Sequence, residues 1–426
     1  MKFLYSDSLD YIDPDYDFLA DRPSRDRKAH AADQFPHEFM DEPPYDGLLV
    51  SRAAVGDATR RGKYTQSQSM RFRREGARAF LRFPEAHFPG SMMMGDNGAF
   101  SYRNEDVPPY EVADTLEFYE DGGFTHGCAV DHLIFDLNGD EPPSEEARRR
   151  SAITLENADA FITQSRALGD RFTPIGVVQG WSVGSMADAA ESLTKMGYDY
   201  LALGGTVPLR IEQISAILER VRERVGSHVR LHVLGFGKID HVDVLRRHGV
   251  ASFDTTSPLL RAFKDGRRNY FVAQPDGSVG YHIAIRIPDA IDNPKLLRQA
   301  KRGRLDQESL LRLERRALKE VRAFGRGGSS PEEAVEATLA YGRYALWDEG
   351  RTKEQNETRL QTLRRSYSAA LRERPWEHCE CRVCREIGVE VMIFRASNRN
   401  KRRGMHNLHV FTQQLAKSNV AGKVNA

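Results

Sequence analysis

The sequence lacks long hydrophobic runs, and it contains few cysteines. None of the apolar stretches in its 426 residues approaches the roughly 18 residues that cross a bilayer, so we expect no membrane span. The chain starts Met1-Lys2-Phe3-Leu4 and turns acidic at Asp7, which is not the pattern of a signal peptide. Its four cysteines, three of them clustered, do not form a disulfide framework. We therefore expect a cytoplasmic protein with reduced thiols. Internal repeats and a phosphate-binding P-loop are also absent from the sequence.

A cluster of cysteines near the end of the chain predicts a metal site. The metal-binding side chains in this region are Cys379, Cys381, Cys384, His378, His406 and His409. Three thiolates and one imidazole fill the four tetrahedral positions of zinc and leave none open for a substrate. We therefore predict a structural Zn2+ held by the three cysteines, with the histidine ligand left open among the three candidates. The remaining cysteine, Cys128, is predicted to be a core thiol.

The net charge of +1 conceals an uneven distribution along the chain. Residues 293–426 carry 28 Lys and Arg against 16 Asp and Glu, whereas residues 1–292 carry 34 against 45. A basic final third on an acidic body favours contact with a polyanion such as a nucleic acid. The stretches 301–304 and 401–403 contain few acids, and the candidates for binding phosphates are the basic helices and the tail near 395–403. The alternative is that the basic residues belong to ordinary solvated helices rich in Arg and Glu.

Short apolar stretches alternate with helix-length amphipathic ones from about residue 47 onward. The strand-like stretches are 47–50, 91–94, 130–135, 174–178, 200–203, 231–234 and 251–253. Helical patterns between them include 145–165, 185–196, 211–225 and 241–248. Strands separated by helices imply parallel pairing, and seven of them predict an α/β fold, a (β/α)8 TIM barrel. The eighth strand is not placed, and either residues 269–272 or a stretch before residue 90 is a candidate for it.

Four regions follow from this pattern. We predict an extended N-terminal segment at 1–46 and the catalytic barrel at 47–292. A basic helical insertion with the last barrel helix is predicted at 293–378, and a zinc-binding subdomain with a tail at 379–426. Within the insertion, Ser330 is the expected N-cap of a helix, because proline at the first helical position and glutamates in the first turn follow it.

Two aspartates, Asp96 and Asp254, stand where predicted strands end. The C-terminal ends of the strands meet on one face of a TIM barrel, and that face carries the active site. A pair of carboxylates suits displacement at a sugar C1′. One carboxylate attacks the anomeric carbon, while the other donates a proton to the departing base or accepts one from the incoming base. Each aspartate alone has a simpler interpretation, as a cap for the turn at Gly98 or for the helix after Pro258. Gly-rich turns beside both let a flat base approach the backbone.

Six motifs, all in one order, resemble those of the tRNA-guanine transglycosylase superfamily. Five are Asp96-Asn97-Gly98-Ala99-Phe100-Ser101, Phe135-Asp136, Val178-Gln179-Gly180, Gly204-Gly205 and Phe253-Asp254-Thr255-Thr256-Ser257-Pro258. The sixth is the cysteine cluster followed by His406-Asn407-Leu408, and it favours His406 as the fourth zinc ligand. The resemblance implies that Asp254 is the nucleophile and Asp96 the general acid and base. It also implies four base-binding residues, namely Asp136, Gln179, Gly204 and Gly205.

Departures from the family pattern bear on the substrate. Ala99 and Ser101 replace the family's Gly and Gln, and Thr206 stands where queuine-type enzymes tend to have Leu. The nucleophile lies 125 residues before Cys379, farther than in bacterial tRNA enzymes. The N-terminal sequence, including Pro43-Pro44-Tyr45-Asp46-Gly47, resembles that of the DNA-guanine transglycosylases of bacterial and phage 7-deazaguanine DNA-modification clusters.

That second resemblance implies exchange of guanine in DNA for 7-cyano-7-deazaguanine (preQ0), within a DNA modification and restriction system. A partner ATPase from the same cluster is a candidate partner, and no ATP, nicotinamide or flavin is implied for the chain itself. Two alternatives remain open. One is the same exchange in tRNA, and the other is a non-catalytic partner subunit that keeps the fold. The presence of both Asp96 and Asp254 argues against the second alternative.

Overall fold

The chain folds into two compact units. The computed structural model describes every residue except 58, 136, 138–141, 292, 304, 396, 425 and 426. One unit comprises residues 1–9 and 45–256, and the other comprises residues 10–44 and 257–426. Within the described residues, no helix is long and apolar enough to cross a membrane.

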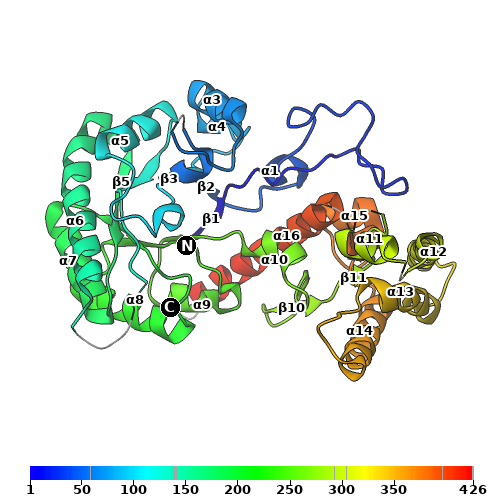
Figure 1. Ribbon diagram of the computed structural model, residues 1–426. Helices are drawn as coiled ribbons and strands as arrows, with labels where there is room; N and C mark the ends of the chain where they lie inside the picture. The colour runs from blue at the N-terminus through cyan, green and yellow to red at the C-terminus, as the bar shows by residue number, and fades with distance from the viewer. Residues whose placement is uncertain are drawn as a thin grey trace. The chain divides into compact units, whose positions relative to one another are not determined.

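The first unit contains a closed barrel of eight parallel strands (Figure 1). The strands are β1 (Lys2–Ser6), β2 (Gly47–Ser51), β3 (Met92–Asp96), β4 (His126–Cys128), β5 (Thr173–Val178), β6 (Tyr200–Leu203), β7 (Arg230–Val233) and β8 (Ser252–Asp254). They pair in chain order, and β1 closes the barrel against β8, with Leu4 opposite Asp254. The predicted TIM barrel is therefore confirmed.

Three local predictions differ from the structure. The unplaced strand is β1, which lies inside the segment expected to be extended. Residues 269–272 overlap β9 (Tyr270–Ala273), which pairs with β10 (Val279–His282) in an antiparallel hairpin of the second unit. Strand β4 ends at Cys128, so it precedes the predicted stretch at 130–135. Val130 and Ile134 are buried without belonging to a strand. The sequence pattern of a buried apolar run predicts a strand whether or not the run pairs with a neighbour.

Helices flank the strands of the first unit (Figure 1). They are α2 (Arg52–Val55), α3 (Gln66–Glu75), α4 (Ala77–Phe80), α5 (Val112–Asp121), α6 (Glu145–Ser165), α7 (Val183–Met196), α8 (Ile211–Val225) and α9 (Val242–Arg247). Helices α6 and α8 have the predicted bounds. The Ser144 hydroxyl accepts a hydrogen bond from the Ala147 N–H at 3.1 Å and so caps the start of α6.

Side chains alternate along the barrel strands, so one face of each strand fills the interior. The interior layer is apolar and consists of Leu4, Leu49, Met92, Met94, Cys128, Ile175, Val177, Tyr200 and Ala202. Two positions beyond this layer, the same faces of β1, β2 and β3 carry Ser6, Ser51 and Asp96. A ring of polar side chains therefore stands on the apolar layer at the C-terminal end of the strands.

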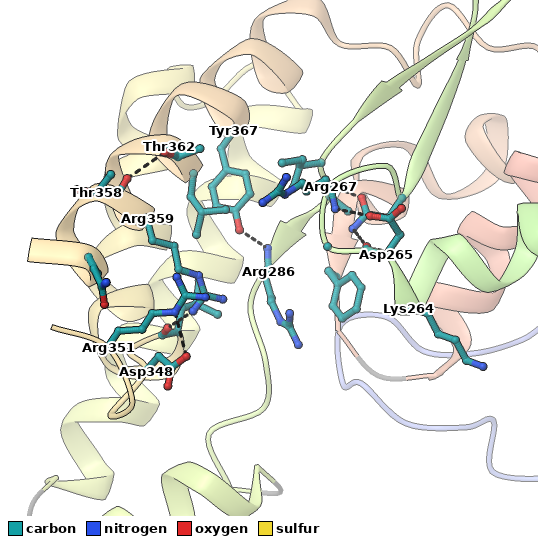
Figure 2. Close-up of a pocket in the computed structure, with 18 of the residues that line it drawn as sticks. Lys264, Asp265, Arg267, Arg286, Asp348, Arg351, Thr358, Arg359, Thr362 and Tyr367 are labelled. Carbon is teal, nitrogen blue, oxygen red and sulfur yellow. Dashed lines mark hydrogen bonds and ion pairs between the residues drawn. The ribbon is translucent and has the colours of Figure 1, made fainter. Parts of the chain in front are cut away.

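The second unit is mostly helical. Its helices are α1 (Pro36–Phe39), α10 (Ser257–Lys264), α11 (Pro294–Lys301), α12 (Gln307–Gly325), α13 (Pro331–Ala345), α14 (Lys353–Glu373), α15 (Arg382–Ile387) and α16 (Ser397–Val424). Ser330 caps α13 as predicted, since its hydroxyl accepts from the Glu333 N–H at 3.2 Å. Two short strands, β11 (Ile285–Arg286) and β12 (Ile393–Phe394), pair in parallel. An open hollow lies beside α14 (Figure 2).

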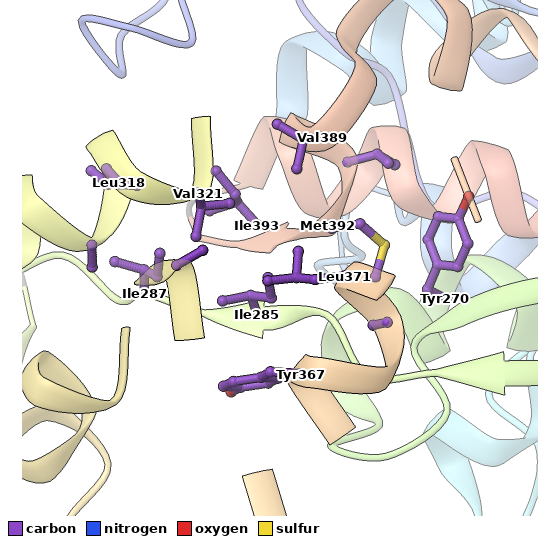
Figure 3. Close-up of a cluster of buried hydrophobic side chains, with 14 of the residues drawn as sticks. Tyr270, Ile285, Ile287, Leu318, Val321, Tyr367, Leu371, Val389, Met392 and Ile393 are labelled. Atoms are coloured by element: carbon purple, nitrogen blue, oxygen red, sulfur yellow. The ribbon is translucent and has the colours of Figure 1, made fainter. Parts of the chain in front are cut away.

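One apolar core holds the second unit together (Figure 3). It joins buried side chains of the strands β11 and β12 to those of α12, α14 and the segment after α15. Labelled members are Ile285, Leu318, Val321, Tyr367, Leu371, Val389, Met392 and Ile393. This core supports the cysteine cluster, because Cys381 and Cys384 belong to it.

The prediction that residues 395–403 grip phosphates is wrong. The four arginines of this stretch expose at most 7% of their surface, and they are Arg395, Arg399, Arg402 and Arg403. Arg399 pairs with Glu390 at 2.8 Å and also with Asp21. Arg402 donates to the Pro14 carbonyl at 2.6 Å. A buried guanidinium must be paired or hydrogen-bonded. Three of these arginines bind residues 10–44, whereas Arg403 donates to the Val391 carbonyl at 3.0 Å.

Candidate active site and metal centre

Asp254, the last residue of β8, is held by three hydrogen-bond donors. Its Oδ1 accepts from the Gly235 N–H at 2.8 Å and lies 3.2 Å from His232 Nε2. Its Oδ2 accepts from the Ser6 hydroxyl at 2.5 Å. The residue is only 4% exposed. Because an ionised carboxylate only accepts hydrogen bonds, three convergent donors fix its orientation.

A chain of hydrogen bonds runs from Asp254 into the barrel. His232 Nδ1 lies 2.6 Å from the Ser252 hydroxyl, which lies 2.5 Å from the Tyr200 hydroxyl. Since the carboxylate accepts, Nε2 of a neutral His232 ring carries the hydrogen, and Nδ1 accepts from Ser252. Tyr200 then donates to Ser252. Each donor in this chain points toward Asp254, so His232 is a positioning residue for the carboxylate.

Asp96, the last residue of β3, lies in a different environment. Burial, with a further contribution from the negative charge of Asp254, raises its pKa from 3.8 to about 7. Hydrogen bonds from the Ser51 hydroxyl and the Gly98 N–H oppose that rise, and its Oδ1 has no partner among the described residues. Gly98 has φ +70°, and a Cβ there would lie 2.3 Å from Ser51 Oγ. Glycine is therefore required beside this carboxyl group.

The two aspartates occupy related positions in the ring. Strands β1 and β2 separate β8 from β3, and each aspartate takes a hydroxyl from the nearer of the two, Ser6 for Asp254 and Ser51 for Asp96. One carboxylate is fixed by donors, while the other is half-protonated near neutral pH. Environments that differ in this way suit one group to nucleophilic attack and the other to proton transfer.

Gln179 lies at the end of β5 and connects to an aspartate that the sequence analysis missed. Its Nε2 donates to Asp131 Oδ2 at 2.8 Å, and its Oε1 accepts from the Ile134 N–H at 3.3 Å. Burial raises the pKa of Asp131 to about 6, although the bond from Gln179 lowers it. A Cβ on Gly204 would lie 2.2 Å from Gln179 Nε2, so this glycine makes room for the amide.

The prediction for this region named Asp136, which lies outside the described residues. Asp136 was predicted because it matches the Phe-Asp motif of the family. Asp131 instead lies within a buried apolar run directly after β4. An isolated acid in such a run could have identified Asp131 from the sequence, because burying a carboxylate is costly and buried carboxylates are common at functional sites. Gly205 is adjacent to Gln179. It has φ +68°, and a Cβ at this position would lie 3.5 Å from Gln179 Oε1.

The four predicted metal ligands come together in the second unit. The Sγ atoms of the three cysteines and Nδ1 of His406 all lie within 4.8 Å of one another. Nδ1 is 3.4 Å from Cys379 Sγ, 3.4 Å from Cys381 Sγ and 3.3 Å from Cys384 Sγ. Zinc bonds of about 2.3 Å to sulfur and about 2.0 Å to nitrogen place tetrahedral S and N ligands roughly 3.5 Å apart. The cluster therefore fits Zn2+.

Surrounding groups orient the histidine of this cluster. His406 Nε2 lies 2.8 Å from the Phe271 carbonyl, so it donates there and leaves Nδ1 free to bind a metal. The Tyr270 ring stacks on the imidazole at a centroid distance of 4.1 Å. Both residues belong to β9, whose hairpin thus buttresses the site. His409 and His378 are not members of the four-residue cluster.

Comparison with known proteins places the chain in a family. No protein-family model matches it. A DNA-guanine transglycosylase from Salmonella montevideo is 38% identical over 424 residues, which cover 97% of this chain and 96% of the relative. The chain belongs to the DNA-guanine transglycosylase family. The protein is therefore an enzyme of the glycosyltransferase class, and the resemblance drawn from its motifs is confirmed.

Two aromatic side chains of this transglycosylase are exposed on the loops that follow β3 and β4. Phe100 is 57% exposed and Phe135 is 38% exposed, and their rings meet edge to face at 6.2 Å. The Arg103 guanidinium lies over the Phe100 ring at 4.4 Å. Exposed aromatic rings at the C-terminal end of the strands offer flat surfaces on which a nucleic-acid base can stack.

Proposed function

We propose that the enzyme exchanges guanine in DNA for 7-cyano-7-deazaguanine, as part of a DNA modification and restriction system. The observation that carries the proposal is the pair of carboxylates in one ring, Asp254 fixed by three donors and Asp96 with a pKa near 7. The relative's name supports DNA as the polymer. A partner ATPase that opens the duplex remains a candidate, because the target nucleotide must leave its stack.

In the first step, Asp254 attacks C1′ of the target deoxyguanosine. We assign the attack to Oδ2, because among the described residues its one partner is the rotatable hydroxyl of Ser6, whereas Oδ1 accepts from two donors. The C1′–N9 bond breaks, and its electron pair leaves with guanine. Asp96, protonated at this stage, gives its proton to the departing base. A sugar–enzyme ester remains, and the DNA strand stays intact.

In the second step, the incoming base displaces the ester. Asp96, now ionised, takes the proton from the attacking nitrogen, and the C1′–Oδ2 bond breaks to restore the Asp254 carboxylate. Throughout, the Gly235 N–H and His232 Nε2 hold Oδ1, the carbonyl oxygen of the ester. They stabilise the charge that returns to the carboxylate as the ester breaks. Two inversions at C1′ give net retention.

Recognition of the base falls to the groups around Gln179. Asp131 and Gln179 present acceptor and donor atoms from one hydrogen-bonded pair, and the backbone at Gly204 and Gly205 allows close approach. Asp136 remains the base-reading aspartate that the family motif implies. We assign the zinc site a structural role. Cys379, Cys381, Cys384 and His406 would hold Zn2+, which when bound cross-links α15 and the segment just before it to α16 and supplies folding energy.

Trapping the covalent intermediate tests this proposal. The enzyme is incubated with a labelled oligodeoxynucleotide without incoming base, and denaturing gels then report adducts. Wild type should form an adduct, Asp254→Ala should form none, and Asp96→Asn should form it slowly. Asp199→Asn serves as the matched control, because this side chain is 70% exposed before β6. An adduct in Asp254→Ala would overturn the assignment of the nucleophile.

A further inference from the structure

The second unit carries an open hollow of about 1000 Å³ that the proposed chemistry does not use (Figure 2). Its walls are the connection from α10 to β9, the segment before and within β11, and the first half of α14. Two smaller hollows, of about 320 and 380 Å³, share lining residues with it and extend it at either side. The whole depression lies within the second unit.

Cations line both walls of this hollow. Figure 2 shows Lys264 and Arg267 on one side, Arg351 and Arg359 on the other, and Arg286 between them. Among the described residues, no ion pair involves Lys264, Arg267 or Arg286. Arg286 is held instead by its contact with the Phe394 ring, 4.9 Å from the guanidinium carbon. Three exposed cations here are thus available for an anionic ligand.

The acidic residues of the hollow are largely occupied. Asp265 accepts from the backbone N–H groups of Arg267 at 2.7 Å and Arg268 at 3.0 Å, so it caps its own loop. Asp348 pairs with Arg351 at 3.1 Å. Arg359 donates to the Leu346 carbonyl at 2.9 Å. Five cations and three acids, the third being Glu354, line the hollow, which therefore keeps a basic excess.

We propose that this hollow binds the sugar–phosphate backbone of DNA without regard to sequence, through Lys264, Arg267 and Arg286. The inference rests on the proposed function, which makes DNA the substrate. A long, open depression with cations on two walls fits a polyanionic strand better than a small anion, which an enclosed site would surround. The arginines of 395–403 are buried and do not serve this purpose, whereas Lys264, Arg267 and Arg286 are exposed.

Salt-dependent binding tests the proposal. The variant is Lys264→Gln/Arg267→Gln/Arg286→Gln, and the ligand is a fluorescent duplex. The matched control, Arg315→Gln/Arg316→Gln/Lys319→Gln, removes the same charge from the exposed face of α12. Three lost phosphate contacts should weaken binding about tenfold or more at 0.1 M salt and lower the slope of log K against log salt by about 2 to 3. The control should change neither quantity appreciably.

Each outcome separates this proposal from the proposed function. Equal weakening in both variants would overturn it, since total charge would then explain the loss. Unchanged binding in the hollow variant would also overturn it and would leave an acidic protein as the occupant. If wild type itself forms no DNA adduct, the proposed function fails first. Arg267→Glu, a single change in an exposed loop, repeats the test with less risk to folding, and retained zinc content shows that the unit is folded.

Discussion

Replacing Asp96 by asparagine should stabilise the protein, and more so at high pH. The pKa of Asp96 rises from 3.8 to about 7 on folding. The folded state therefore binds this proton more tightly than the unfolded state, so the stabilising effect of the proton is complete below pH 3.8 and is lost as the pH rises toward 7. Each pH unit in that window costs about 1.4 kcal/mol. Above pH 7 the ionised carboxylate costs about 4 kcal/mol, an order-of-magnitude figure.

Urea unfolding of Asp96→Asn and wild type at pH 5 and pH 8.5 measures this effect. Asparagine does not titrate, so its advantage over wild type should be roughly 3 kcal/mol larger at pH 8.5 than at pH 5. Glu156→Gln, on the exposed face of α6, should keep the same small difference at both values. An advantage for Asp96→Asn that does not change with pH would show that Asp96 is already ionised at pH 5. The physical basis for its acid role would then be lost.

Three further predictions concern the zinc centre, the base site and the buried arginines. Cys381→Ser should lose zinc and lower the melting temperature, and a variant without zinc that melted like wild type would refute the structural role. Gly204→Ala places a Cβ 2.2 Å from Gln179 Nε2, so steady-state kinetics should show a raised KM for the incoming base; an unchanged KM would separate Gln179 from base binding. Arg399→Met should cost roughly 3 kcal/mol in urea unfolding, the low end for a broken buried pair, because its acidic partners keep other arginines. Arg315→Met, on the exposed face of α12, should cost little, and equal costs would contradict the burial argument.

The barrel could be predicted because its strands are buried apolar runs separated by amphipathic helices. Strand β1 could not be recognised in the same way. It stands 40 residues before β2, and Asp7 follows it directly. Its partner β8 lies some 250 residues away, so only the closed ladder identifies it. Local pattern does not contain such long-range pairing.

The positions of Asp96 and Asp254 could be predicted, but not what distinguishes them. The hydroxyls that hold them come from β1 and β2, and His232 reaches Asp254 from β7, so these contacts depend on barrel register. The basic count of the final third was correct, yet four of its arginines are buried. Charge counts do not record whether a guanidinium faces water or a buried carboxylate, and only tertiary packing decides this.

Incorporation of labelled 7-cyano-7-deazaguanine into plasmid DNA and bulk tRNA, measured side by side, tests both the choice of polymer and the covalent mechanism. We expect label in DNA, none in tRNA, and loss of the DNA label in Asp254→Ala. Label in tRNA alone would contradict the choice of polymer. Label in DNA that persisted in Asp254→Ala would contradict the covalent mechanism.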